Sequence, residues 1–157
     1  MRVVEANTHE DVEHARTLFK EYQEGLGISL CFQNFDQELA NLPGDYAPPT
    51  GRLLLLSTGD EAGGCVAFRK IDGNSCEMKR LFLRPGFRGK GLGRVLVEAA
   101  VQEARQLGYK RMRLDTVPGK MDDAIALYRS FGFREIEPYY DTPLNQTIFM
   151  ELELHNV

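Results

Sequence analysis

The stretch FRGKGLGRVL, residues 87–96, combines three glycines with basic residues and runs directly into a helical pattern. The residues before it, 75–83, are typical of a strand, so this stretch joins a strand to a helix. A helix N-terminus offers N–H groups without intrahelical partners and the positive end of the helix dipole, and it therefore favours anions. Glycines allow close approach to the backbone and the left-handed dihedrals of an anion-binding turn. The stretch therefore predicts a phosphate-binding turn at the start of a helix.

The charge around this turn favours a phosphate ligand. The twenty residues between Glu77 and Glu98 contain no acid and six cations, in a chain whose formal net charge is −4. These cations are Lys79, Arg80, Arg84, Arg88, Lys90 and Arg94. A solvated basic loop without a ligand is the alternative, but the position between strand and helix and the six uncompensated cations favour phosphate. The Walker pattern GxxxxGK[ST] is absent, which disfavours nucleotide hydrolysis.

The composition predicts one globular domain covering residues 1–157. Hydrophobic residues make up 43% of the chain and charged residues 27%, and the length suits a single core. The acidic balance argues against a nucleic-acid partner. Apolar runs such as residues 53–56 are too short to cross a membrane, so we expect a cytoplasmic protein without a membrane partner. The three cysteines are then expected as reduced thiols, and the absence of CxxC and HxxxH spacings predicts no metal site.

The rest of the chain predicts strands and helices in a defined order. Thr8 is a candidate N-cap with Asp11 in capping-box position, and Gly25 and Gly27 end the helix that follows. Strands are expected at 2–6, 52–57, 64–71, 75–83, 110–117, 133–136 and 146–154, and helices at 9–26, 35–42, 91–107 and 121–131. Hairpin strands followed by strands separated by helices imply an α/β chain of the α+β type. Its mixed, mostly antiparallel central sheet would have about six to seven strands, flanked by about four helices.

The strand at 75–83 changes the side on which its apolar residues lie. Cys76 and Met78 share one face by their spacing, whereas Leu81 and Leu83 have the opposite parity. A β-bulge produces such a slip, and so does a strand end that is buried on both faces.

Two segments resemble a known family. Residues 88–93, RGKGLG, match the R/Q-x-x-G-x-G/A signature of the GNAT family of N-acetyltransferases, and residues 81–87, LFLRPGF, look like that family's central strand and the start of its loop. Residues 124–133, AIALYRSFGF, are similar to its A-x-x-L-Y-x-x-x-G-F segment. The order of the expected elements fits the family over essentially the whole chain.

The resemblance implies that acetyl-CoA is the acyl donor. Its diphosphate would be bound by Arg88, Gly89, Lys90, Gly91, Leu92, Gly93 and Arg94, and its pantetheine arm would pair with the backbone of Leu81, Phe82 and Leu83. The expected reaction is direct transfer of the acetyl group, in a ternary complex, to a primary amine of a small molecule or amino acid. The alternatives are a CoA-binding module without catalysis and an enzyme that acetylates protein N-termini or lysines. The resemblance also allows a homodimer.

For the chemistry, the resemblance implies Tyr128 as the general acid and Glu77 as the general base. A phenol has a reference pKa of about 10, so Tyr128 is expected to be protonated and able to donate to a leaving thiolate. Asp115, at the end of the next strand, is a rival base. Two structural alternatives stay open: Tyr128 packs in the core, and Glu77 forms a cross-strand ion pair with a lysine or arginine.

The acceptor pocket is expected in the segments 27–35 and 137–146, which vary within the family. Phe32, Asp115, Tyr139 and Tyr140 are the candidate acceptor-binding residues. The rings of Tyr139 and Tyr140 and the carboxylate of Asp141 suit a cationic amine. A tyrosine-rich connection between two strands, without a binding role, is the alternative.

Overall fold

Seven strands form one sheet in the order β1-β2-β3-β4-β5-β7-β6 in a computed structural model that describes residues 1–27, 34–119, 122–143 and 146–154. The strands are β1 (Arg2–Glu5), β2 (Arg52–Ser57), β3 (Ala62–Lys70), β4 (Ser75–Leu83), β5 (Arg111–Thr116), β6 (Arg134–Ile136) and β7 (Ile148–Glu153). The helices are α1 (His9–Leu26), α2 (Phe35–Asn41), α3 (Leu92–Gln106) and α4 (Asp122–Phe131). Only β4 and β5 pair in parallel, so the expected mixed, mostly antiparallel sheet is confirmed.

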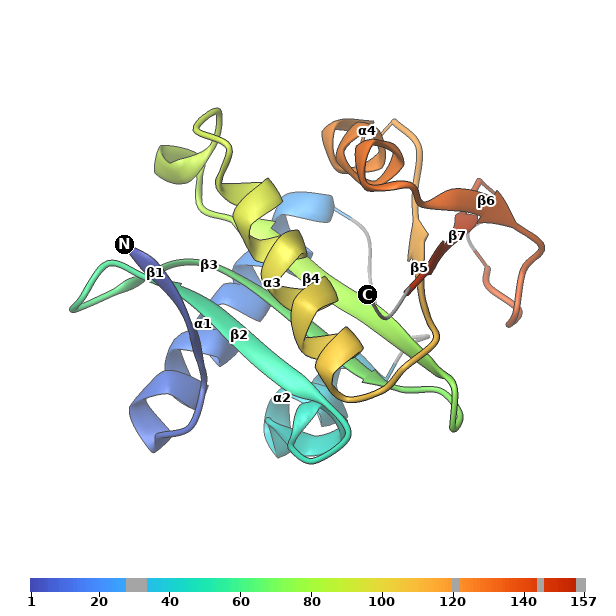
Figure 1. Ribbon diagram of the computed structural model, residues 1–157. Helices are drawn as coiled ribbons and strands as arrows, with labels where there is room; N and C mark the ends of the chain where they lie inside the picture. Colours follow the sequence, from blue (N-terminus) through green and yellow to red (C-terminus); the bar gives the residue numbers. More distant parts are fainter. Residues whose placement is uncertain (28–33, 120–121, 144–145, 155–157) are drawn as a thin grey trace.

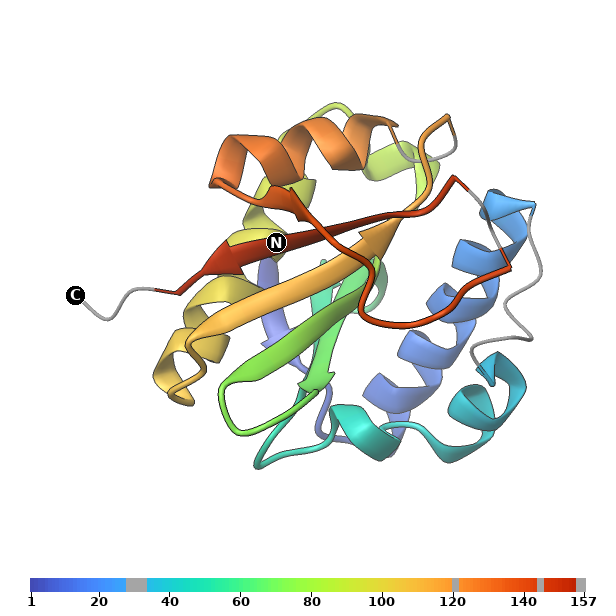
Figure 2. The ribbon, with the colours of Figure 1, turned by 90° about the vertical axis from the view of Figure 1, so that its right-hand side faces the viewer.

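The helices cover both faces of the sheet, with α1 and α2 on one side and α3 and α4 on the other (Figures 1 and 2). Each face has its own core. In β2, Leu53 and Leu55 pack in the core under α1, whereas Leu54 and Leu56 pack in the core under α3. A central strand buried on both faces explains why β2 is a continuous apolar run rather than an alternating one.

The ends of α1 are those that the sequence predicts. The Thr8 side chain accepts a hydrogen bond from the Asp11 N–H, and the Asp11 carboxylate accepts one from the Thr8 N–H, which completes a capping box. Gly27 ends the helix in the left-handed region, with φ 65°. The other elements begin and end within about two residues of their expected bounds, as fraying ends generally do. Among the described residues no helix is long and apolar enough to cross a membrane.

Of the two explanations for the change of parity in β4, the structure supports the β-bulge. Cys65 of β3 pairs with Phe82, but Ala67 pairs with Lys79, so β4 has one residue more than its partner between these pairs. Arg80 lies in this extra stretch and adopts a positive φ of 64°. The side chains on either side of the bulge therefore change parity, and Met78 and Leu81 pack on the same face of the sheet.

The strands β4 and β5 separate before the bulge. Their parallel pairing covers only Ser75–Glu77 against Arg111–Arg113. Beyond Glu77 the backbone of β4 continues toward Leu83 and pairs with β3 alone. The separation leaves the β5-facing edge of β4 without a strand partner, next to the glycine-rich turn.

The bulge is anchored by a buried ion pair. The Arg80 guanidinium donates from Nε and from one terminal nitrogen to the two oxygens of Glu38, at 2.9 and 3.1 Å. The Arg80 side chain is 2% exposed and lies over the rings of Tyr22 and Phe35. The Tyr46 hydroxyl donates to the same Glu38 carboxylate. α2 is therefore tied to the irregular part of the central strand.

Removing this carboxylate should destabilise the fold strongly. We expect Glu38→Ala to lower the free energy of unfolding by about 3–5 kcal/mol, because it removes the carboxylate to which the buried Arg80 guanidinium donates twice. Denaturant unfolding measures the change. Glu13→Ala is the matched control, since Glu13 pairs with Arg16 on an exposed surface of α1 and its loss should cost about 1 kcal/mol or less. Equal effects of the two substitutions would contradict a stabilising role for the buried pair.

Candidate active site

The glycine-rich turn presents open backbone at the start of α3. Gly89 and Gly91 have φ values of 76° and 77°, and Gly91 is the N-cap residue of α3. The first N–H groups of any α-helix lack an intrahelical partner, and no side chain of the described residues caps those of α3. Apart from the chain neighbours, no described residue lies within 4 Å of the position that a Cβ would take at either glycine. This exposed, left-handed backbone at a helix N-terminus fits a phosphate group.

Gly93 has a different role from the two glycines before it. A Cβ at Gly93 would lie 3.3 Å from Leu127 of α4 and 3.8 Å from Leu83 of β4. The missing side chain therefore lets α3 pack closely against α4 and the end of β4. This contact holds the turn beside the separated strands.

The prediction of six uncompensated cations is wrong, because three of them pair with acids that lie outside residues 78–97. Lys79 pairs with Glu77 and Asp115, and Arg84 donates to Glu21 at 2.9 and 3.0 Å. Arg80 pairs with Glu38, as described above.

The other three cations lie nearer the turn. Arg94 donates to the Ser130 hydroxyl and lies over the ring of Phe131. Arg88 is exposed, and its Nε donates to the Leu83 carbonyl at 2.8 Å. Lys90 is exposed beside it. Arg88 and Lys90 are therefore the side chains best placed to add positive charge at the turn.

A narrow pocket opens where β4 and β5 separate. It is lined by Tyr22, Met78, Lys79, Arg80, Leu81, Asp115 and Tyr128. It has room for about one water molecule. Three sequence-predicted site residues, Tyr128 of α4, Asp115 of β5 and Leu81 of β4, thus share one pocket at the strand separation.

Tyr128 is buried in this pocket, with 5% of its surface exposed. Its ring packs against Phe133, so the core alternative holds for the ring. Burial raises the pKa of the Tyr128 hydroxyl well above its usual value, and the negative charge expected on Asp115 acts in the same direction. The hydroxyl is therefore protonated at neutral pH and able to donate.

Glu77 lies on the other face of β4 from Met78, among three polar partners. Arg69 of β3 donates to its Oε1 at 3.1 Å, and the Tyr139 hydroxyl donates to its Oε2 at 2.6 Å. The Lys79 ammonium lies 3.8 Å from Oε1. Burial alone would raise the pKa of Glu77, but Lys79, Tyr139 and Arg69 outweigh it, so the pKa lies below its usual value. The cross-strand ion pair is confirmed, and Glu77 is a carboxylate at neutral pH.

The loop before β7 completes the cluster. Tyr139 donates to Glu77 and Tyr140 donates to Asp115, and both rings pack edge-on against Phe149 of β7. Each tyrosine therefore contacts one of the two candidate bases. Phe32, the fourth candidate for acceptor binding, lies outside the described residues.

Lys79 and Arg69 also belong to this cluster, although the sequence analysis considered Lys79 only as a cation near the turn and did not name Arg69. Lys79 joins the two carboxylates, since its Nζ lies 3.8 Å from both Glu77 and Asp115. Burial lowers the pKa of the Lys79 ammonium, and the two carboxylates only partly offset that shift. A spacing of two residues in a strand places Lys79 on the face of Glu77, and this signal was present in the sequence.

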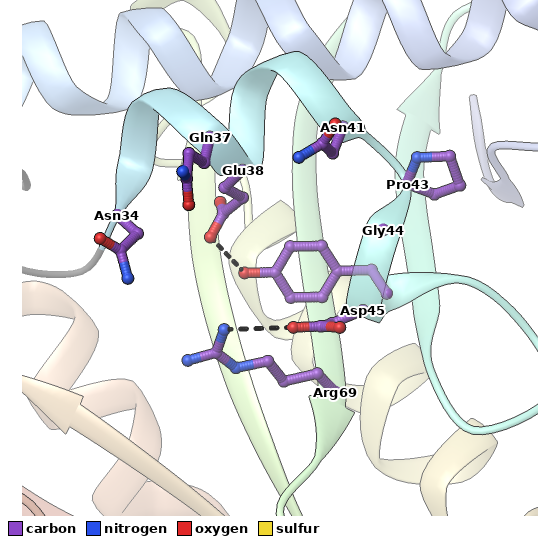
Figure 3. Close-up of a pocket in the computed structure, with 9 residues that line it drawn as sticks. Asn34, Gln37, Glu38, Asn41, Pro43, Gly44, Asp45 and Arg69 are labelled. Atoms are coloured by element: carbon purple, nitrogen blue, oxygen red, sulfur yellow. Dashed lines mark hydrogen bonds and ion pairs between the residues drawn. The ribbon is translucent and has the colours of Figure 1, made fainter.

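A second, polar pocket of about 250 Å³ lies beside α2. Figure 3 shows Gln37, Glu38 and Asn41 on α2, with Arg69 reaching across from β3 toward Asp45. Because Arg69 also donates to Glu77, one guanidinium connects this pocket with the carboxylate cluster.

Comparison with known proteins identifies the class to which this fold and site belong. Residues 9–133 match the acetyltransferase (GNAT) family. An uncharacterized N-acetyltransferase of Schizosaccharomyces pombe is 43% identical over 149 residues, which cover 92% of this chain and 90% of that protein. An acetyltransferase of the GNAT family from Staphylococcus aureus has the same fold, with a TM-score of 0.81 and 20% identity over 98% of this chain and 99% of that one.

A GNAT acetyltransferase from Elizabethkingia anophelis, solved with acetyl-CoA bound, also shares the fold. Its TM-score is 0.60 at 22% identity, covering 78% of this chain and 82% of that one. The chain therefore belongs to the acetyltransferase (GNAT) family. Its activity is acyl transfer of the N-acetyltransferase type.

Proposed function

We propose that this protein transfers the acetyl group of acetyl-CoA directly to a primary amine of a small molecule or amino acid. The observation that carries the proposal is the shared pocket of Tyr128 and Asp115 at the separation of β4 and β5. A proton donor and a carboxylate meet there beside an anion-binding turn. Tyr139 and Tyr140 cover the two carboxylates, which favours a small acceptor over a bulky one.

Backbone groups of the glycine-rich turn and of the neighbouring end of β4 would hold the acetyl-CoA donor. The diphosphate fits the N–H groups of residues 88–93, with positive charge from Arg88 and Lys90. The pantetheine arm carries amide groups, and the unpaired edge of β4 at Leu81–Leu83 offers backbone donors and acceptors to match them. Both contacts direct the thioester toward the pocket that Tyr128 lines.

The reaction needs a base that deprotonates the acceptor amine and an acid that protonates the leaving thiolate. The acceptor amine loses a proton to a carboxylate, Asp115 or Glu77, directly or through a water molecule. The nitrogen forms a bond to the thioester carbon, the carbon–sulfur bond breaks, and Tyr128 protonates the leaving thiolate. Asp115 lines the pocket and has 17% of its side chain exposed, against 5% for Glu77. This difference favours Asp115 as the group that first meets the amine.

The buried cysteines favour direct transfer over a cysteine-linked intermediate. The two cysteines within the described residues, Cys65 and Cys76, are free and buried, and neither lines the active-site pocket. Burial raises the pKa of Cys76 to about 12 and that of Cys65 further. Thiols with such high pKa values contain too little thiolate to act as nucleophiles at neutral pH.

Release of free CoA tests the proposal. The purified protein is mixed with acetyl-CoA and a panel of small primary amines, amino acids and peptides, and the thiol produced is followed with a chromogenic reagent. We expect turnover with at least one small amine and none without an acceptor. Tight binding of acetyl-CoA without thiol release across the panel would favour a binding module and would contradict the proposal.

The glycine-rich turn gives a separate prediction for the donor. We expect Gly91→Ala to weaken acetyl-CoA binding about tenfold or more in calorimetry, because the left-handed backbone at the helix N-terminus costs an L-residue about 1–2 kcal/mol and tends to relax.

Gly108→Ala is the matched control for this substitution. Gly108 has φ 89° and also has open space where a Cβ would lie, but it follows the C-terminal end of α3. Its replacement imposes a similar backbone strain and should leave the affinity for acetyl-CoA unchanged. Equal losses of affinity in both variants would argue against binding at the turn.

A further inference from the structure

Lys79 makes fewer hydrogen bonds than the other charged residues that line the active-site pocket, Arg80 and Asp115. Its side chain is 4% exposed and lines the pocket together with Asp115 and Tyr128. Within the described part of the chain it makes two ion pairs, to Glu77 and Asp115, each at 3.8 Å, and no hydrogen bond. An ammonium has three N–H donors. The Lys79 donors are therefore available to an acceptor that enters the pocket.

The neighbouring cations do not share this feature. Arg80 also lines the pocket, but its guanidinium is engaged with both oxygens of Glu38. Arg69 donates to Glu77 at 3.1 Å. Lys79 is thus the cation of this cluster best placed to bind a negatively charged group that enters the pocket.

Asp115 supplies the opposite charge in the same pocket. Its Oδ2 lies 3.8 Å from the Lys79 ammonium and accepts a hydrogen bond from Tyr140. A cation and an anion this close are complementary to a zwitterion whose own charges lie equally close together. An α-amino acid carries its ammonium and its carboxylate on one carbon atom and fits this arrangement.

We propose that the acceptor is an α-amino acid, with its carboxylate bound by Lys79 and its amino group bound by Asp115. This inference rests on the proposed function, because it names the acceptor of that reaction. The amino group then lies in the pocket that Tyr128 lines, where the acyl group is expected. Charge-assisted hydrogen bonds from Lys79 to the carboxylate satisfy donors that are otherwise unused.

The same arrangement selects against other amines. A diamine would bring its second ammonium toward Lys79, and like charges repel strongly in a buried site. A monoamine or an amino-acid ester would leave the Lys79 donors without a charged acceptor. Selectivity thus comes from the attraction between Lys79 and a carboxylate and from the repulsion between Lys79 and a second ammonium.

Matched substrates test the inference on the wild-type protein. Each of several α-amino acids is compared with its methyl ester and with the corresponding amine that lacks the carboxylate, by kcat/KM for CoA release. We expect the free acid to be preferred by about 10- to 100-fold, the ratio that a hydrogen bond to a charged group supplies. Esterification lowers the pKa of an amino group, so the ester is the more readily deprotonated nucleophile, and this bias runs against the expected result.

Two variants assign the preference to Lys79. Lys79→Met keeps a similar side-chain length without charge, and we expect it to raise KM for the amino acid and remove most of the preference for the free acid. Lys70→Met is the control, because Lys70 is exposed at the end of β3. Binding of the N-acetyl amino acid, measured by calorimetry, gives a readout that needs no turnover.

The outcomes separate the two proposals. Turnover with ester and amine equal to that with the free acid overturns the amino-acid inference and leaves the acetyl transfer intact. Absence of CoA release with every amine contradicts the proposed function, and calorimetry then decides the inference: Lys79-dependent binding of the N-acetyl amino acid supports it, and no binding overturns it. If Lys79→Met does not fold, the comparison of substrates on the wild-type protein remains decisive.

Discussion

Tyr128→Phe is expected to lower kcat by about 10²–10⁴-fold while the affinity for acetyl-CoA stays close to that of the wild type. The substitution removes only the hydroxyl, so the ring keeps its packing against Phe133 in the core. What is lost is the proton donor for the leaving thiolate. Steady-state kinetics together with calorimetry for acetyl-CoA separates the two effects.

Tyr109→Phe is the control for loss of a buried tyrosine hydroxyl. Tyr109 packs in the same core and donates to the Thr50 carbonyl at 2.6 Å, but it does not line the pocket. Its replacement should leave kcat within about twofold of the wild type.

Because burial raises the pKa of Tyr128, the wild-type rate should also show no loss from deprotonation of this acid up to at least its usual pKa of about 10. A Tyr128→Phe variant with wild-type kcat would remove this residue from the mechanism.

Glu77→Gln is expected to lower kcat/KM by about 10²-fold or more. Glutamine keeps the shape of the side chain but removes the negative charge that Arg69, Lys79 and Tyr139 surround. Glu77 acts either as the base that takes the proton or as the group that orients Lys79 beside Asp115. Both roles need the negative charge of its carboxylate, which glutamine lacks. Glu135→Gln, at an exposed carboxylate of β6, should leave kcat/KM unchanged.

The dependence of stability on pH gives a second readout for Glu77. Its pKa in the folded protein lies below its usual value, so its contribution to stability is complete above the unfolded-state pKa of about 4.3. That contribution is lost as the pH falls through the lower, folded-state value. Denaturant unfolding from pH 7 downward should show this loss in the wild type and a shallower decline in Glu77→Gln. Parallel curves for the two proteins would show that the carboxylate is not stabilised by its partners.

Much of the fold could be predicted because it depends on local patterns. The capping box at Thr8 and the helix that starts after Gly91 are set by residues next to one another in the chain. The bulge in β4 was visible as a change of parity between Met78 and Leu81. In each case the type or spacing of adjacent residues in the sequence indicates the backbone feature.

The partners of the buried charges could not be predicted in the same way. Arg80 meets Glu38 across 42 residues, and Tyr139 meets Glu77 across 62. These contacts depend on how α2 and the loop before β7 pack onto the sheet, which no spacing in the sequence encodes. Charge counting along the chain consequently overstated the free positive charge near the turn.

The extra residue at Arg80 divides the central strand into two lengths that are free to vary separately. Residues up to Glu77 are paired with strands on both sides, whereas the residues that follow, Lys79 included, are paired with β3 alone. In the proposed function, Glu77 and Lys79 face the acceptor, whereas the segment that is proposed to hold the donor lies beyond Arg80. Substitutions at these two positions are therefore expected to change the acceptor amine more than the affinity for the acyl donor.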